Sequence, residues 1–299
     1  MGGRLWTLIL AGGDGRRLSA LTRLIAGAPI PKQYCRLLGE RSLLEATIER
    51  IAPLVPPDRT LAIVNRDHVG LAERQLRALP GANVIVQPSN RDTGPGMLLS
   101  LLVLARRDPD ALVAVFPSDH FVADAPAFLR HVARAELVVR RMPDRIALLG
   151  IPPEHADPGF GYVEPGEPAG YDARAVAAFH EKPCVAAAER LVRRGGLWNS
   201  FVMVCQAARM LQLLEAHRGS DVERMRSVVD SPDALADLYA SLTPWNFSHD
   251  FLARVPEHLV VLRAEGTGWS DWGTRESIER TLRRLDRVPP WFLPAAATA

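Results

Sequence analysis

Lysine is almost absent from this sequence. Of its 36 basic residues only Lys32 and Lys182 are lysine, and the others are arginine. In a chain that has exchanged lysine for arginine wherever the fold allows, a lysine survives by chance or because a planar guanidinium cannot replace a compact ammonium there. Composition alone leaves both interpretations open.

Cysteine, long apolar runs and net charge are scarce as well. The three cysteines (Cys35, Cys184 and Cys205) lie far apart without metal-ligand spacing, which predicts reduced thiols in a cytoplasmic protein. No apolar run reaches the roughly 20 residues of a membrane span. A formal net charge of +2 gives no field that would favour nucleic acid or a membrane surface. The first predicted strand begins almost at once, so we expect no signal peptide.

The first half of the 299 residues alternates apolar segments with helical patterns. The sequence predicts strands over residues 5–10, 61–64, 84–86 and 112–116, and helices over 67–79 and 97–104. Another helix begins with a capping box made by Ser42 and Glu45. Continuous apolar strands are typical of a parallel sheet that is covered on both faces. We therefore predict a Rossmann-like α/β fold with a mostly parallel central sheet and helices on both faces.

The second half of the chain differs in composition and in its pattern of predicted elements. Residues 151–171 are rich in proline and glycine and predict turns. Later segments predict strands over 175–180, 197–204 and 259–262, and helices over 186–194 and over 207–242 with a break at Pro232. We expect the arginine-rich helix that reaches about residue 287 to be a solvated face, and the tail after it to be frayed.

A glycine-rich turn follows the first predicted strand. Gly12, Gly13 and Gly15 come directly before Arg16 and Arg17, and the leucine spacing of a helix follows. A strand, a glycine turn and a helix direct backbone N–H groups at a phosphate, and glycine lets a ligand approach without meeting a Cβ. The alternative is an ordinary βα connection, but three glycines and two arginines in six residues favour phosphate binding. The third glycine of a Rossmann fingerprint and the Gly-Lys of a P-loop are absent.

Unusual polar residues follow other predicted strands. Asn90 and Arg91 lie in the loop after the third strand, and Asp119 follows the fourth. The carboxyl ends of parallel strands form the edge where open α/β sheets bind ligands. One site assembled from several loops therefore explains all of these residues together.

Six motifs occur in order along the chain. They are Leu-Ala-Gly-Gly-Asp-Gly-Arg-Arg-Leu at 10–18, Pro-Lys-Gln at 31–33, Pro-Ser-Asp-His at 117–120, Glu-Lys-Pro at 181–183, Leu-Trp-Asn-Ser at 197–200 and Trp-Ser-Asp-Trp-Gly at 269–273. Together they resemble the motifs of the sugar-1-phosphate nucleotidyltransferases, most closely the mannose-1-phosphate guanylyltransferases. The resemblance covers about residues 5–278.

The resemblance implies a single domain with a nucleotidyltransferase fold similar to that of GT-A glycosyltransferases. This domain would span residues 1–287, with an NTP-binding half over about 1–150, a sugar-phosphate-binding half over about 151–287 and a flexible tail over 288–299. No β-helix repeats or isomerase extension follow the core, so we expect neither acetyl transfer nor isomerisation. A homodimer is compatible with the resemblance.

The family reaction joins an NTP and a sugar 1-phosphate, with Mg²⁺, to give an NDP-sugar and diphosphate. For this chain the resemblance implies GTP and α-D-mannose 1-phosphate. A phosphate whose second pKa lies near ~6 is ionised at neutral pH, so its attack on the α-phosphate needs no general base. The reaction then depends on aligning two anions and on stabilising charge at the α-phosphate and the leaving diphosphate. Accordingly, no Ser/His/Asp or Cys/His arrangement stands out.

Five charged residues match catalytic positions of the family. The resemblance implies that Arg17 neutralises the β- and γ-phosphates, Lys32 holds the triphosphate near the α-phosphate and Lys182 holds the phosphate of the sugar. It implies that Asp119 and Asp271 share the Mg²⁺, which usually takes one or two carboxylates beside substrate phosphates. The alternative for each aspartate is a turn cap. Because both lysines match lysine positions, function is favoured over chance survival.

Further residues match binding positions. The resemblance implies nucleotide binding by Leu10, Ala11, Gly12, Gly13, Gly15, Arg16, Gln87, Asn90, Arg91, Thr93 and Ser118. It implies that Gly161, Glu181 and Asn199 bind sugar hydroxyls. We expect Trp198, Trp269 and Trp272 to pack in the interior, and His120 to be structural because Mg²⁺ prefers oxygen.

Two residues depart from the guanylyltransferase pattern. Arg16 replaces a small hydroxyl residue, and Gln87 stands where many of these enzymes carry a glutamate that suits the N–H donors of guanine. The alternative substrates are therefore UTP or dTTP with a glucose or heptose 1-phosphate. A GT-A glycosyltransferase is less favoured because an Asp-x-Asp metal site is absent, and a non-catalytic nucleotide-sugar binder because the charged residues are retained together.

Overall fold

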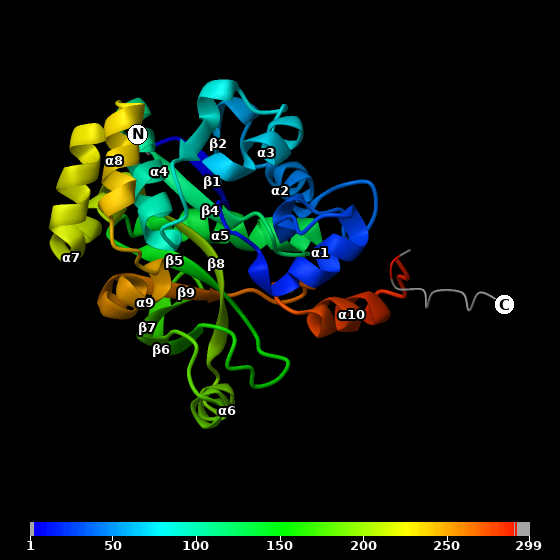
Figure 1. The fold of residues 1–299 in the computed structure, drawn as a ribbon. Coiled ribbons are helices and arrows are strands. Elements are labelled where there is room, and N and C mark those ends of the chain that lie inside the picture. The colour runs from blue at the N-terminus through cyan, green and yellow to red at the C-terminus, as the bar shows by residue number, and fades with distance from the viewer. Residues whose placement is uncertain (1–2, 290, 292–299) are drawn as a thin grey trace.

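The computed structural model describes residues 3–289 and residue 291 (Figure 1). Its strands are β1 (Leu5–Ala11), β2 (Thr60–Asn65), β3 (Val84–Gln87), β4 (Leu112–Pro117), β5 (Ile146–Ile151), β6 (Tyr162–Gly170), β7 (Ala173–His180), β8 (Leu197–Gln206) and β9 (Leu259–Arg263). Its α-helices are α1 (Ser19–Ala26), α2 (Leu43–Ile51), α3 (Val69–Gln75), α4 (Thr93–Arg107), α5 (Ala125–Arg141), α6 (Val185–Arg193), α7 (Ala207–Val228), α8 (Pro232–Ser241), α9 (Phe247–Asp250) and α10 (Arg275–Arg284). Across these ranges no helix is both long and apolar enough to cross a membrane.

One sheet includes the strands of both halves of the chain, in the order β3-β2-β1-β4-β8-β5-β9-β7-β6. The pairs β3–β2, β2–β1, β1–β4 and β5–β9 are parallel, whereas β8 and β7 run against their neighbours. All the other strands of the sheet therefore point the same way. This confirms the predicted α/β fold with a mostly parallel sheet, and it brings the carboxyl ends of β1, β2, β3 and β4 to one edge.

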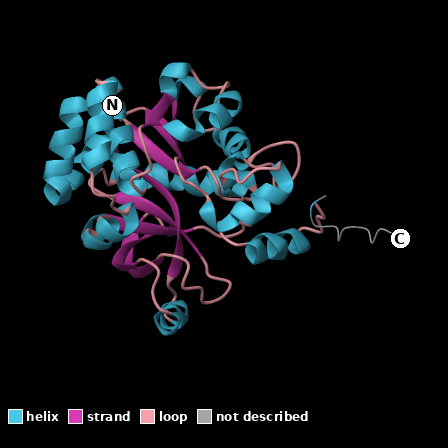
Figure 2. Cartoon of the chain, in the orientation of Figure 1, coloured by secondary structure: helices cyan, strands magenta, loops and turns pink. Residues whose placement is uncertain are grey.

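Alternate side chains of the central strands enter two separate cores. On β4, Val113 and Val115 lie in the core that contains α4 and α7, whereas Leu112, Ala114 and Phe116 lie in the core that contains α2 and α5. Helices accordingly cover both faces of the sheet (Figure 2). Burial of such a side chain contributes roughly 1.5–3 kcal/mol, so a strand buried on both faces must be apolar throughout.

Two of the differences between the predicted and the observed elements involve proline. Helix α4 begins at Thr93 instead of residue 97, because Pro95 occupies its first turn, where the missing N–H has no helical partner. Residues 151–171 contain strand β6 in addition to turns. Its Pro165 and Pro168 are tolerated because β6 lies at the end of the strand order and its pairing with β7 shifts register at both prolines.

The C-terminal helix packs beside the helix that follows the glycine turn. Leu21 of α1, Trp272, and Ile278 and Leu282 of α10 share a third apolar cluster, and α1 and α10 lie side by side in Figure 1. The arginine-rich helix is therefore solvated on one face only. Most of the tail predicted to fray, residues 288–299, lies outside the described residues.

The predicted capping box at α2 is confirmed. The Ser42 hydroxyl accepts from the Glu45 N–H at 3.1 Å and donates to Gln75 Oε1 at 2.6 Å, and the Glu45 carboxylate accepts from the Ser42 N–H at 2.8 Å. Ser42→Ala should lower the free energy of unfolding by about 1–2 kcal/mol in urea titrations. Ser227→Ala, which removes an exposed hydroxyl, is the matched control. Equal effects in the two variants would contradict the role of the cap.

Candidate functional site

A cavity of about 650 Å³ opens at the carboxyl ends of β1, β3 and β4. Most of the residues predicted to bind the nucleotide line it, namely Leu10, Gly12, Gly13, Arg16, Gln87, Asn90, Thr93 and Ser118, and Asp119 does so as well. Its volume lies in the range of about 300–1,000 Å³ that is usual for small-molecule sites. The predicted edge of the sheet is thus hollowed where the polar residues gather.

The glycine turn at this edge is closely packed. A Cβ on Gly12 would lie 2.5 Å from the Gln87 Nε2 atom, and a Cβ on Gly15 would lie 2.7 Å from the Lys32 N atom. Gly15 also has a φ of +63°, which favours glycine. Larger residues at either position would therefore displace a neighbouring candidate residue.

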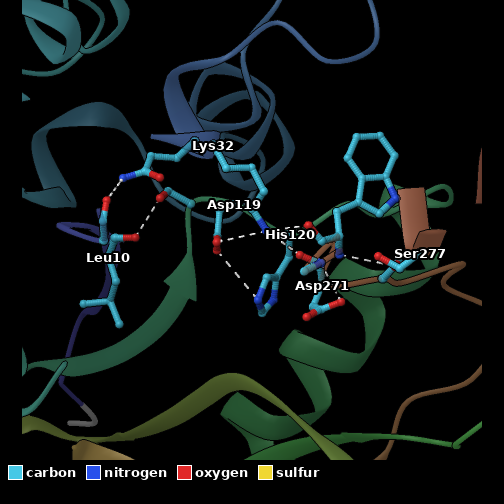
Figure 3. A network of polar contacts seen from close by, with 12 residues as sticks. Leu10, Lys32, Asp119, His120, Asp271 and Ser277 are labelled. Atoms are coloured by element: carbon cyan, nitrogen blue, oxygen red, sulfur yellow. Dashed lines mark hydrogen bonds and ion pairs between the residues drawn. The ribbon is translucent and has the colours of Figure 1, made fainter. Parts of the chain in front are cut away.

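Lys32 lies at the centre of a buried polar network (Figure 3). It begins a single 3-10 turn after the extended Pro31, and it is only 5% exposed. Its Nζ donates to the carbonyls of Asp271 and Trp272 at 2.5 and 3.1 Å, and it lies 3.1 Å from Asp119 Oδ2. One ammonium thus brings the ends of three distant motifs together.

The charges around Asp119 and His120 are set by this ammonium. Burial by itself raises the pKa of Asp119, but the positive charge of Lys32 outweighs it and holds that pKa below its usual value. Burial lowers the pKa of His120, and Lys32 and Arg50 lower it further although Asp119 and Asp271 oppose them. Asp119 is therefore an anion beside a neutral imidazole, whose Nε2 lies 3.7 Å from Asp119 Oδ1.

Asp271 borders a second, smaller recess of about 60 Å³. Arg17 lines it, as do Trp198, Trp269 and Arg280. The three tryptophans are buried as expected, although two of them also line this recess. Asp119 thus lies on the large cavity and Asp271 on the recess, with the Lys32 ammonium in contact with both residues.

Sequence reasoning missed Arg280. Its helix was expected to be a solvated face, yet Thr274, Ser277, Thr281 and Arg284 line the recess with it. These positions recur every three or four residues, so helical spacing was the available signal.

The residues fit a magnesium ion. Within residues 3–289 and 291, no group of three or more His, Cys, Asp or Glu side chains could hold a metal by itself. Two carboxylates are nevertheless sufficient for Mg²⁺ when substrate phosphates supply further oxygen ligands. The Asp119 side chain is 35% exposed to the cavity, and Asp271 keeps one oxygen, Oδ2, free of the 3.0 Å bond from the Gly273 N–H to Oδ1.

The three residues predicted to bind the sugar lie together. A Cβ on Gly161 would lie 2.7 Å from Glu181 Oε2 and 3.5 Å from the Asn199 Cβ, and the Asn199 N–H donates to the Gly161 carbonyl at 2.8 Å. Glu181 is only 14% exposed, and burial raises its pKa despite the opposing charge of Lys182. A side chain at position 161 would therefore displace the Glu181 carboxylate.

Lys182 adjoins this cluster in an unusual conformation. Its φ is +46°, which costs free energy for any residue other than glycine, and such strain gathers at functional sites. Its side chain is 60% exposed, and its Nζ lies 3.5 Å from Glu181 Oε1. The second lysine of the chain is thus presented to solvent beside the predicted sugar residues.

Arg91 is one of the residues predicted to bind the nucleotide that do not line the cavity. Its guanidinium donates to the carbonyls of Tyr239 and Ala240 at 2.6 and 3.1 Å, and it does not line the cavity. The neighbouring Thr93 hydroxyl accepts from the Phe247 N–H at 2.9 Å. Arg91 therefore attaches the loop after β3 to α8. Two other residues predicted to bind the nucleotide, Ala11 and Gly15, also lie outside the cavity lining. Conversely, the lining includes three residues that were not predicted to bind the nucleotide, namely Asp14, Gln33 and Asp92.

Comparison with known proteins decides the family. The model of the nucleotidyl transferase family matches residues 6–287. The chain belongs to this family. The resemblance read from the six motifs is thereby confirmed.

Two curated relatives and one solved structure illustrate the similarity. The chain is 32% identical over 285 residues to a mannose-1-phosphate guanylyltransferase of Salmonella muenchen, covering 92% of this chain and 59% of the relative. It is 30% identical over 282 residues to the xanthan biosynthesis protein XanB of Xanthomonas campestris pv. campestris strain B100, covering 91% and 58%. The crystal structure of a Thermus thermophilus protein, titled mannose-1-phosphate geranyltransferase, matches with a TM-score of 0.82 at 29% identity, covering 93% and 79%. The chain thus spans less than three-fifths of the length of these two curated relatives.

Lys32→Met should destabilise the fold in a pH-dependent way. At pH 7 we expect a loss of about 2–3 kcal/mol, below the 3–5 typical of a fully buried pair because Asp119 is partly exposed. In the wild type, the lowered pKa of Asp119 adds stability that is lost as pH falls through it. In the variant, no ammonium opposes the effect of burial, so the pKa of Asp119 is raised. The carboxyl group is then protonated at low pH, and the free-energy cost of burying an unpaired charge disappears.

The loss should therefore shrink between pH 7 and pH 3 in denaturant titrations. Lys182→Met, at an exposed lysine, is the control and should change stability little. A loss that is constant with pH would contradict the assigned coupling.

Proposed function

We propose that this protein transfers a guanylyl group from GTP to α-D-mannose 1-phosphate, giving GDP-mannose and diphosphate. The observation that carries the proposal is the Lys32 network, in which one buried ammonium joins Asp119 of the large cavity to Asp271 of the arginine-lined recess. A nucleoside in the cavity would have its α-phosphate near this network. Its β- and γ-phosphates would then lie toward Arg17.

The reaction is a direct displacement at the α-phosphorus. An oxygen of the sugar phosphate forms a new bond to the α-phosphorus. The bond between the α-phosphorus and the oxygen that bridges it to the β-phosphate breaks, and its electron pair leaves with diphosphate. Because the attacking oxygen is already ionised, no side chain has to remove a proton. Lys32 and Arg17 would stabilise charge at the α-phosphate and on the leaving diphosphate.

The sugar phosphate would approach from the other half of the chain. Gly161, Glu181 and Asn199 would hold its hydroxyls, and Lys182 would hold its phosphate and orient the attacking oxygen. On β8, Trp198 lines the recess and Phe201 lines the cavity, so Asn199 lies between the two. This placement supports delivery of the sugar to the network.

Asp119 and Asp271 would hold Mg²⁺, which when bound neutralises phosphate charge. The Lys32 ammonium and the metal would both contact Asp119.

One observation also supports a second substrate pair. The Gln87 amide donates through Nε2 to Asn65 Oδ1, and its buried Oε1 carbonyl has no partner among the described residues, so a bound base would be the partner that Oε1 lacks. A carbonyl accepts from the N1–H of guanine, but it accepts equally from the imide N–H of uracil or thymine. UTP or dTTP with a glucose or heptose 1-phosphate is therefore the second candidate.

A substrate matrix tests the proposal. Diphosphate release is measured for GTP, ATP, UTP, CTP and dTTP with mannose, glucose and heptose 1-phosphates. We expect the highest kcat/KM for GTP with mannose 1-phosphate, in keeping with the name of the Salmonella muenchen relative. A preference for UTP or dTTP would favour the second candidate, and no release with any pair would refute nucleotidyl transfer.

Asp271→Asn should abolish most Mg²⁺-dependent turnover while the protein remains folded. The amide still accepts from the Gly273 N–H but has lost the charge that binds the metal. We expect kcat to fall on the order of a hundredfold, as when one charge-stabilising contact is removed. Asp230→Asn, at an exposed aspartate, is the control. A near-normal rate would refute the metal assignment.

Lys182→Arg should reduce activity although it keeps the positive charge. A planar guanidinium does not replace a compact ammonium, and we expect kcat/KM for the sugar phosphate to fall about tenfold with the KM for GTP unchanged. The reverse exchange Arg193→Lys on α6 is the control. Unchanged kinetics would mean that Lys182 survives in the sequence for another reason.

A further inference from the structure

Side-chain donors bind the carbonyl groups of the glycine turn one after another. We infer that Gln33 and Asn65 are positioning residues, which hold the peptide planes of residues 11–14 so that their N–H groups remain available to the triphosphate. This inference rests on the proposed function. Neither residue was among those predicted to bind a substrate.

Gln33 holds the first and third carbonyls of the turn. Its Nε2 donates to the Ala11 carbonyl at 3.1 Å and to the Gly13 carbonyl at 2.7 Å. The Tyr34 hydroxyl adds a second donor to Ala11 at 2.9 Å. Gln33 is only 2% exposed, so its amide has little freedom to turn away from these acceptors.

Asn65 holds the second carbonyl. Its Nδ2 donates to the Gly12 carbonyl at 2.6 Å and to Asp14 Oδ1 at 3.3 Å, while its Oδ1 accepts from Gln87 Nε2. Because a carbonyl and a carboxylate can only accept, the Asn65 amide must turn its NH₂ toward the loop. This orientation in turn requires Gln87 to donate. A single chain of bonds therefore connects the phosphate turn to the base-reading residue.

The bonds to the carbonyls determine where the N–H groups lie. In a trans peptide the carbonyl and the following N–H point in opposite directions, and the described chain contains no cis peptide. The N–H groups of Gly12, Gly13 and Asp14 are thus turned away from the donors that hold the carbonyls. Among the described residues, none of these three N–H groups has a protein acceptor.

This asymmetry between satisfied carbonyls and free N–H groups suits an anion. Gly12, Gly13 and Asp14 all line the large cavity. Consecutive N–H groups that face one way form an electropositive cradle, and fixing them in advance avoids an ordering cost when the ligand binds. Gln33 and Asn65 would therefore act on phosphate binding through the backbone, without touching the substrate's reacting atoms.

Binding of inorganic triphosphate to the full chain tests this inference. Calorimetry in the presence of Mg²⁺ gives Kd for the wild type, Gln33→Met and Asn65→Leu. We expect Kd to rise about tenfold in each variant, since the loss of one hydrogen bond between a backbone N–H and a charged phosphate typically weakens binding by about this factor. The Kd for mannose 1-phosphate should stay unchanged, because its predicted residues lie elsewhere.

Two matched variants control for lost packing. Gln75 donates to the Tyr34 carbonyl at 3.1 Å, and the buried Asn83 donates to the carbonyls of Pro57 and Asp58, each at 3.0 Å. Both are amides bonded to backbone carbonyls outside the turn. Gln75→Met and Asn83→Leu should therefore keep the triphosphate Kd within about twofold, since a stability loss alone does not change affinity in the folded population.

A milder substitution at position 65 keeps the inference testable if Asn65→Leu does not fold. Asn65→Ser keeps one donor and should give a Kd between those of the wild type and Asn65→Leu. Wild-type affinity in Gln33→Met and Asn65→Ser would overturn the inference, as would an equal loss in the matched controls or no triphosphate binding by the wild type. If the wild type binds triphosphate but no substrate pair reacts, the proposed function fails while this inference is still tested.

Discussion

The burial of the Lys32 ammonium is the constraint on which the site depends. Removing an ammonium from water is costly unless all its N–H groups find acceptors. Here the acceptors are the carboxylate of Asp119 and the carbonyls of Asp271 and Trp272. Asp119 follows β4, whereas Asp271 and Trp272 lie in a loop more than 200 residues after Lys32 in the sequence. The segments of the site must therefore assemble together, because any one of them alone would leave the charge unpaired.

The same ammonium limits what can surround it. Gly15 cannot carry a side chain because the Lys32 backbone lies where its Cβ would be, and a Cβ on Gly273 would displace the Asp271 carboxylate. The glycines of two motifs thus serve the packing around one charge as well as the approach of a ligand. Asp119 remains an anion for the same reason, which keeps it suited to a metal.

Much of the fold was predictable because the strands are buried on both faces. The apolar runs of β1, β2 and β4 follow from this burial, and the capping box at α2 is a purely local signal. Strand β6 and the start of α4 escaped prediction because proline is tolerated at an edge and in a first helical turn. Neither condition is visible until the neighbours of the segment are known.

The candidate site was predictable to a different degree. The motifs contain most of the residues that line the cavity, and the three residues predicted to bind the sugar lie close together. The roles of Gln33 and Asn65 could not be read from the sequence, because a donor to a backbone carbonyl has no characteristic spacing. Arg280 lies on a helical repeat, but that spacing alone does not say that the face borders a recess. Arg91 illustrates the converse, since a charged residue in a binding loop can attach that loop to the scaffold.

The two lysines of the chain are retained for opposite physical reasons. At Lys32, a guanidinium would have to place five N–H donors in a fixed plane where the structure offers three acceptors around a point. Lys182 is mostly exposed and has no such packing constraint, so its environment in the unliganded chain would accept arginine. Its left-handed backbone conformation adds a cost that no contact of the free protein explains. Its strained, exposed position therefore supports the proposal that a ligand selects lysine here, and the sugar phosphate is the proposed ligand.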